Sequence, residues 1–254
     1  MRANLKASLD SCLKALKLPT ILTEYSNIAK HSLEDKDSYE SYLLKLTKKE
    51  EEERFNKKIK YFLKRAKFPK IKTIDEYDFS KVDIAKESIF QLCHGHFLSD
   101  SENIIFFGSP GSGKTHLAIG IGRELCLKGH KILFHTGCSL VQELVKEKNN
   151  LTLTNYFKKM RVYDLIIIDE LGYIPFAKTE GDLLFQFISD RYERKSLMIT
   201  TNLAFSEWDS LFQDKMLASA GIDRLVHYSQ IFKFEKAQSY RSESAKKRLK
   251  NRKK

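Results

Sequence analysis

The sequence has few features of a secreted or membrane protein. Its four cysteines, Cys12, Cys93, Cys126 and Cys138, are scattered and form no C-x-x-C pair, which disfavours a disulfide framework or a zinc ribbon. No apolar run approaches the roughly 18 residues that a membrane-spanning helix needs, and the N-terminus has no apolar stretch of signal-peptide length. We therefore expect a cytoplasmic protein without a membrane partner.

Glycine and proline are nearly absent from the first quarter of the chain. Residues 1–67 contain no glycine and one proline, Pro19, so little there interrupts a helix. Apolar side chains recur at helical spacing, and we expect these stripes to pack on neighbouring helices. The acidic run Glu50–Glu53 is expected near the start of the second striped helix, where it complements the dipole. The stripe residues are Tyr39, Tyr42, Leu43, Leu46, Phe55, Ile59, Phe62, Leu63 and Ala66.

The net charge of +12 is concentrated in two segments. Residues 45–72 hold twelve Lys and Arg against four Glu, and residues 246–254 hold seven Lys and Arg and no acid, so the rest of the chain is slightly negative. Two basic segments on a nearly neutral body indicate a polyanionic partner such as nucleic acid. On the outer face of the second striped helix, the candidate DNA contacts are Arg54, Lys57, Lys58, Lys64 and Arg65.

After Phe68-Pro69, where proline disfavours helix in the residue before it, residues 69–80 are expected to form an extended connector. Short apolar segments at 103–108, 131–136, 164–168 and 197–201 then alternate with helical patterns, which is typical of a parallel sheet covered on both faces. The sequence therefore predicts three parts. These are a small all-helical basic N-terminal domain (1–68), an α/β P-loop domain with a parallel sheet between helices (69–245) and a basic tail (246–254).

The first of the apolar segments ends in a phosphate-binding pattern. Gly108-x-x-x-x-Gly113-Lys114-Thr115 satisfies G-x-x-x-x-G-K-[ST], with a strand before it and a helix after it. Glycines let successive backbone N–H groups point at phosphate oxygens, and the helix start adds its positive dipole end. Lys114 would reach the β- and γ-phosphates, and the Thr115 hydroxyl would ligate Mg²⁺. The candidate nucleotide-binding residues are Gly108, Ser109, Pro110, Gly111, Ser112, Gly113, Lys114, Thr115 and His116.

Polar side chains end two further apolar segments. Asp169 and Glu170 follow "LIII", and we expect Asp169 to hold Mg²⁺ and Glu170 to orient and activate an attacking water. Asn202 follows "LMITT", where its amide could reach the γ-phosphate or the water. The adjacent Asp and Glu favour hydrolysis over phosphoryl transfer to a small acceptor.

Two arginines near the C-terminus are candidates for stabilising transition-state charge. Arg224 lies in "DRL" after an expected helix at about 213–221, and Arg241 lies in "SYR". An arginine near phosphates can accelerate the reaction strongly. From spacing alone, each is equally compatible with an ordinary surface arginine.

Several segments together resemble the IstB family, the ATP-binding helpers of insertion sequences, which are relatives of the DnaC helicase loader within the AAA+ ATPases. The segments include "GSPGSGKTHLAIGIG", "YDLIIIDELGYIPF", "TTNLAFSEW" and "DRLVHYSQIFKFEKAQSYR". The resemblance implies that Arg224 is a finger reaching a neighbouring subunit's nucleotide and that Arg241 is a second sensor in cis. It also implies ATP as the nucleotide, self-association into AAA+ oligomers, binding to duplex DNA and recruitment of a transposase encoded in the same element.

The sequence therefore favours an AAA+ ATPase that assembles on double-stranded DNA when ATP is bound and assists a transposase. Three alternatives use the same nucleotide site. A DnaC-like helicase loader would differ in its client, an ATP-gated DNA-binding module would have negligible turnover, and a metabolic kinase would leave the two basic segments without a purpose.

Overall fold

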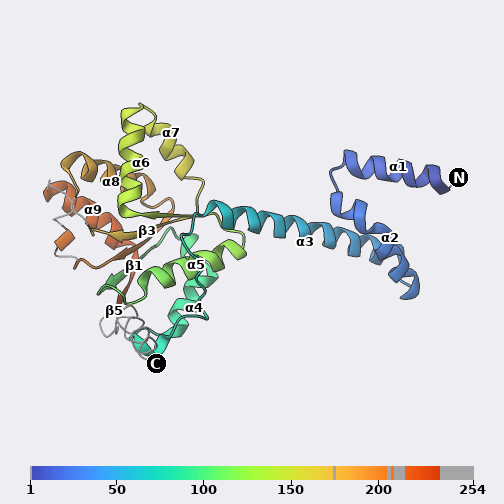
Figure 1. Ribbon diagram of the computed structural model, residues 1–254, viewed down its shortest axis with the longest axis horizontal. Coiled ribbons are helices and arrows are strands. Elements are labelled where there is room, and N and C mark those ends of the chain that lie inside the picture. The colour runs from blue at the N-terminus through green and yellow to red at the C-terminus, as the bar shows by residue number, and fades with distance from the viewer. Residues whose placement is uncertain (1, 174–175, 205–206, 209–214, 235–254) are drawn as a thin grey trace, which may run out of the picture. The chain divides into compact units, whose positions relative to one another are not determined.

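The structure is a computed structural model that describes residues 2–173, 176–204, 207–208 and 215–234 (Figure 1). The chain forms two compact units, residues 1–61 and residues 62–254. The division falls within a long helix, because Phe62 near its end and Ala66 just after it are buried in the core of the second unit.

The first unit is helical, as the composition predicts. It contains α1 (Arg2–Ala15), α2 (Pro19–Glu34) and most of α3 (Tyr39–Arg65). Its small core is formed by Leu13, Ile21 and Leu46, which lie on the three helices. The expected stripe is only partly buried, because Tyr39, Leu43 and Phe55 remain exposed on α3.

The acidic run Glu50–Glu53 does not lie near a helix start, where the sequence predicted it. The run lies in the middle of α3, which begins at Tyr39, and Glu50 is buried. Its Oε2 accepts the backbone N–H groups of Thr20 and Ile21 at 2.8 and 3.0 Å, in the first turn of α2. Because residue Leu18 at the N-cap of α2 has no side-chain acceptor, Glu50 satisfies these donors from another helix.

The second unit is an α/β domain built on one parallel sheet. Its strands are β1 (Asn103–Gly108), β2 (Ile132–Thr136), β3 (Leu165–Leu171), β4 (Ser196–Thr201) and β5 (Ser229–Phe234), in the spatial order β2-β3-β4-β1-β5. All four pairings between neighbouring strands are parallel. Four of these strands match the apolar segments predicted from the sequence, and β5 adds the segment "SQIFKF".

Helices cover both faces of this sheet, which explains why its inner strands are almost continuously apolar. Ile104 and Phe106 of β1 face a core with α4 (Lys86–His94) and α5 (Lys114–Leu127). Ile105 lies in the opposite core. The helices that contribute to that core, grouped on the other side of the sheet in Figure 1, are α6 (Gly137–Asn149), α7 (Leu153–Met160), α8 (Lys178–Arg191) and α9 (Lys215–His227).

Strand order also determines which side chains can meet. The carboxyl ends of parallel strands lie along one edge of a sheet, where α/β folds bind ligands. Here β4 lies between β1, which leads into the phosphate loop, and β3, which carries the two carboxylates. A side chain at the end of β4 is therefore adjacent to both.

Candidate nucleotide-binding site

The phosphate loop connects β1 to α5 and is organised around Lys114. The Lys114 side chain is largely buried, and its ammonium donates to the carbonyl oxygens of Gly108 and Ser109 at 2.7 and 2.9 Å. It also donates to Ser112 Oγ at 3.3 Å. The positive charge is thus held within the loop, at the N-terminal end of α5, as an anion-binding site requires.

Gly113 is required where the loop enters α5. Its φ of +92° lies in the left-handed region, and a Cβ there would be 2.5 Å from Cε2 of Tyr77. The Tyr77 hydroxyl donates to the Ser112 carbonyl at 3.0 Å, and the Tyr77 ring packs edge-on against His116. Tyr77 therefore supports the loop from the connector, a role that the motif spacing did not reveal because Tyr77 is 36 residues from Gly113.

The two carboxylates occupy different environments at the end of β3. Asp169 is buried, and its Oδ1 accepts the hydroxyl groups of Thr115 at 2.8 Å and Thr200 at 2.5 Å. Glu170 is exposed, with a φ of +56°, and its side chain lines a cavity beside the phosphate loop. The Asp169–Thr115 contact joins β3 to the phosphate loop and places the two predicted metal ligands side by side.

The Asp169 carboxyl has a raised pKa. Burial is the main cause and the neighbouring Glu170 charge adds to it, whereas hydrogen bonds from Thr200 and Thr115 oppose the shift. Oxygen ligands at this position suit Mg²⁺, which is typically held by one or two protein oxygens together with phosphate oxygens. Among the described residues, no group of three or more His, Cys, Asp and Glu side chains could hold a metal ion alone. Asp169 and Thr115 supply two oxygen atoms of the kind that Mg²⁺ takes together with phosphate oxygens.

Replacing Asp169 with Asn should leave the nucleotide-free protein at least as stable at neutral pH. Because the folded-state pKa is raised, ionised Asp169 destabilises the fold above that pKa, and the cost disappears as pH falls through it. Asn keeps an acceptor oxygen for both threonines but removes the charge. Thermal unfolding should show no loss without ligand, a flatter pH dependence above the ordinary value of 3.8 and a smaller gain than the wild type on adding Mg²⁺ with ATP. A large loss of stability without ligand would contradict this account.

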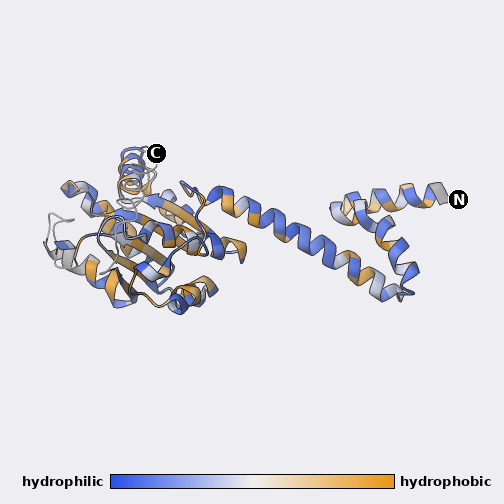
Figure 2. Cartoon of the chain, turned by 60° about the horizontal axis from the view of Figure 1, so that its bottom comes forward, coloured by the Kyte–Doolittle hydropathy of each residue, from blue (hydrophilic) through white to orange (hydrophobic). Residues whose placement is uncertain are grey.

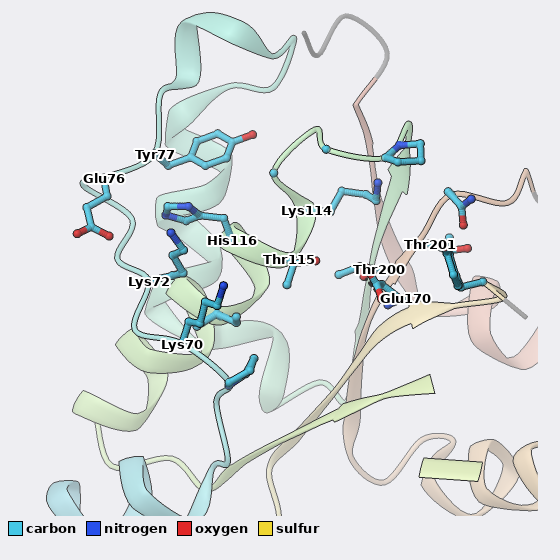
Figure 3. Close-up of a pocket in the computed structure, with 17 residues that line it drawn as sticks. Lys70, Lys72, Glu76, Tyr77, Lys114, Thr115, His116, Glu170, Thr200 and Thr201 are labelled. Atoms are coloured by element: carbon cyan, nitrogen blue, oxygen red, sulfur yellow. Dashed lines mark hydrogen bonds between the residues drawn. The ribbon is translucent and has the colours of Figure 1, made fainter. Parts of the chain in front are cut away.

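A cavity of about 510 Å³ lies over the phosphate loop (Figure 3). Tyr77, Lys72 and His116 lie on one side of Lys114 and Thr115 in the close-up, and Glu170 and Thr200 lie on the other. The wall from the connector was not predicted; it consists of Pro69, Lys70, Lys72, Glu76 and Tyr77. The predicted site residues that line the cavity are Pro110, Gly111, Gly113, Lys114, Thr115, His116, Glu170 and Asn202.

Other predicted residues lie near or beyond this cavity. Gly108, Ser109 and Ser112 belong to the loop and hold Lys114 without lining the cavity. His116 lines the wall, with Nε2 2.7 Å from the Thr73 carbonyl, so it joins the loop to the connector. Arg241 lies outside the residues that the structure describes.

Arg224 is not brought to the cavity of its own chain. It lies in the last turn of α9, where it donates to Ser189 Oγ at 2.6 Å. Its guanidinium lies 5.1 Å from the centre of the Phe185 ring. Both contacts are to α8, and Arg224 is not among the residues that line the cavity.

The candidate DNA contacts lie on α3, whose length is coloured mostly hydrophilic in Figure 2. Arg54 has a structural role, because it donates to Glu50 Oε1 at 2.8 Å and to the Lys17 carbonyl. The other four, Lys57, Lys58, Lys64 and Arg65, are exposed. Within the part of the chain that the structure describes, no helix combines the length and apolar character needed to cross a membrane.

Comparison with known proteins matches residues 11–248 to the family described as IstB-like ATP binding protein. A Geobacillus stearothermophilus protein named for ATP binding and insertion sequence IS5376 is 37% identical, over 89% of this chain and 90% of its own length. A Sinorhizobium fredii protein named for ATP binding in an insertion sequence is 36% identical, over 94% of this chain and 81% of its own.

Solved structures resemble the fold. The crystal structure of the DnaC helicase loader superposes with a TM-score of 0.53 and 22% identity, over 64% of this chain and 96% of that one. A DNA replication initiation factor superposes with a TM-score of 0.56 and 18% identity, over 70% of this chain and 54% of that one. At these identities the likenesses concern the fold alone, a parallel sheet between helices.

Proposed function

The chain belongs to the IstB-like ATP-binding protein family, and from this premise we propose that it is an AAA+ ATPase that assembles on duplex DNA when ATP is bound and assists a transposase. The observation that carries the proposal is one cavity lined by Lys114 and Thr115 from the start of α5 and by Glu170 from β3, with Asp169 hydrogen-bonded to Thr115. A buried cation, a hydroxyl–carboxylate pair and an exposed carboxylate are the groups that nucleotide hydrolysis requires.

In the proposed reaction, the loop N–H groups and Lys114 bind the ATP phosphates and hold the γ-phosphate beneath the ends of β3 and β4. Thr115 and Asp169 would hold Mg²⁺, which when bound neutralises charge on the phosphate oxygens. Glu170 accepts a proton from the attacking water, because its exposed carboxylate lines the cavity. Asn202, which also lines the cavity, orients the water or the γ-phosphate.

The likenesses favour transposition over helicase loading as the function. The relatives named for insertion sequences align over 89% and 94% of this chain, so the matches extend into the N-terminal helices. The DnaC likeness covers 64% of the chain at 22% identity and concerns the fold alone. We therefore propose a transposase from the same element as the client.

The DNA-binding part of the proposal depends on the basic face of α3. Changing Lys57, Lys58, Lys64 and Arg65 together to Gln should weaken binding to duplex DNA of any sequence, because each lost phosphate contact lowers the salt slope of log K by about 0.9. ATP turnover without DNA should remain unchanged. The measurement is fluorescence anisotropy of labelled duplexes across a salt series, with ATP present.

A control variant makes the same change in charge elsewhere. Lys146 and Lys148 of α6 and Lys158 and Lys159 of α7 are exposed and lie outside the nucleotide cavity. Changing these four to Gln should leave both the DNA affinity and the salt slope close to those of the wild type. Equal weakening by the two variants would mean that net charge, and not the α3 face, determines binding.

A further inference from the structure

We propose that Thr200 is a positioning residue that aligns both Asp169 and Glu170 for ATP hydrolysis. This inference rests on the proposed function, because it assigns a role within that same site. At the end of strand β4, the sequence predicts a role for Asn202 and none for Thr200. In the structure Thr200 is 1% exposed, lies at the cavity and contacts both carboxylate residues.

Strand β3 contains a bulge where it pairs with β4. Ile168 pairs with Ile199 and Leu171 pairs with Thr201, so β3 has one residue more than β4 over this interval. Asp169 and Glu170 lie within the interval. A β-bulge disrupts the hydrogen-bond ladder and redirects a side chain, and bulges of this kind are common beside active sites.

Glu170 carries the backbone strain of the bulge. Its φ of +56° lies in the left-handed region, which is uncommon for a residue other than glycine and persists only where the surroundings impose it. The Glu170 N–H donates to Thr200 Oγ1 at 2.9 Å, so a side chain on the neighbouring strand holds this peptide in place. Figure 3 shows Glu170 beside Thr200 at the cavity.

The same hydroxyl also orients Asp169. Thr200 Oγ1 donates its proton to Asp169 Oδ1 at 2.5 Å while it accepts the Glu170 N–H, so one group satisfies both residues. Thr115 donates to that same Oδ1 from the phosphate loop. A buried β-branched side chain has little rotational freedom, so the hydroxyl holds the Asp169 carboxylate and the Glu170 peptide in a fixed relation to each other and to the loop.

A second restraint acts on the Glu170 peptide from α6. A Cβ on Gly137, the first residue of α6, would lie 3.3 Å from Leu171 Cα and 3.4 Å from the Glu170 carbonyl oxygen. The helix start therefore packs closely against the bulge on the β2 side, while Thr200 holds it on the β4 side. With the Thr200 hydroxyl removed, Glu170 loses the hydrogen bond that opposes relaxation of its φ.

Thr200→Val and Thr200→Ser test this role, because Val keeps the shape and removes the hydroxyl whereas Ser keeps the hydroxyl. Thr200→Val should lower kcat for ATP by about 10²-fold, the effect expected from misplacing a catalytic group by about 1 Å. KM and the affinity for a non-hydrolysable ATP analogue should change by less than about threefold, because the phosphate loop is intact. Thr200→Ser should keep kcat within about tenfold of the wild type.

Thr152→Val is a matched control. Thr152 also donates a hydroxyl to a carboxylate, Glu147 Oε2 at 2.6 Å, and it does not line the cavity. This variant should lose stability while its kcat stays near that of the wild type. Should Thr200→Val fail to fold, Thr200→Ala carries the same expectation for kcat.

The outcomes separate this inference from the proposed function. If the wild type hydrolyses no ATP under any condition with DNA, the proposed function is wrong and this inference is wrong with it. If the wild type turns over ATP and folded Thr200→Val does so equally fast, only the inference is overturned. A folded Thr200→Ser variant as slow as Thr200→Val would also overturn it, since the hydroxyl would then not be the group that matters.

Discussion

Glu170→Gln should bind ATP as tightly as the wild type and hydrolyse it about 10²–10⁴-fold more slowly, the usual contribution of a general base. The Glu170 carboxylate is exposed and lines the cavity, whereas Asp169 is buried and hydrogen-bonded to two threonines. Of these two carboxylates, Glu170 is therefore the one free to approach a water beside the γ-phosphate. The amide keeps the shape of the side chain but cannot accept the proton.

The same variant tests the link between ATP and assembly. If ATP holds neighbouring subunits together on DNA, Glu170→Gln should form long-lived ATP-dependent complexes that the wild type forms only transiently. Sedimentation with duplex DNA and ATP measures this directly, and Glu87→Gln, an exposed change in α4, is the control. A Glu170→Gln protein that binds ATP but no longer assembles on DNA would refute the proposal that hydrolysis releases the complex.

Much of the nucleotide site could be predicted from the sequence because its signals are local. Gly113, Lys114 and Thr115 are consecutive, and Asp169 and Glu170 end one apolar strand, so spacing alone places them at the edge of a parallel sheet. The sheet itself was predictable, because strands buried on both faces are continuous apolar runs.

The unpredicted parts depend on contacts between distant segments. Tyr77 supports the phosphate loop from the connector, and no spacing rule joins it to Gly113. The β3 bulge depends on register with β4, which periodicity does not reveal. Glu50 was assigned to a helix start by its own charge pattern, but it is buried because α2 lacks a side-chain cap of its own. In each of these three cases, the residue's function depends on a contact with a segment that is distant in the sequence.

Arg224→Ala should lower ATP turnover by about 10³–10⁵-fold, the effect of losing an arginine supplied in trans. The affinity of a single chain for ATP should stay the same, because Arg224 contacts α8 and does not line its own cavity. Arg194→Ala is the control, since Arg194 is an exposed arginine paired with Asp190 just after α8. The measurement is steady-state phosphate release with duplex DNA present.

A mixing experiment distinguishes a finger in trans from an arginine that only joins α9 to α8. Glu170→Gln subunits keep Arg224, and Arg224→Ala subunits keep Glu170, so each variant lacks what the other supplies. In a head-to-tail assembly of equal parts, about a quarter of the interfaces join an intact site to an intact arginine, and turnover should recover accordingly. If Arg224 acts only within its own chain, by holding Ser189 and Phe185 in place, the mixture will be as inactive as its components and Arg224→Ala will unfold at a lower temperature.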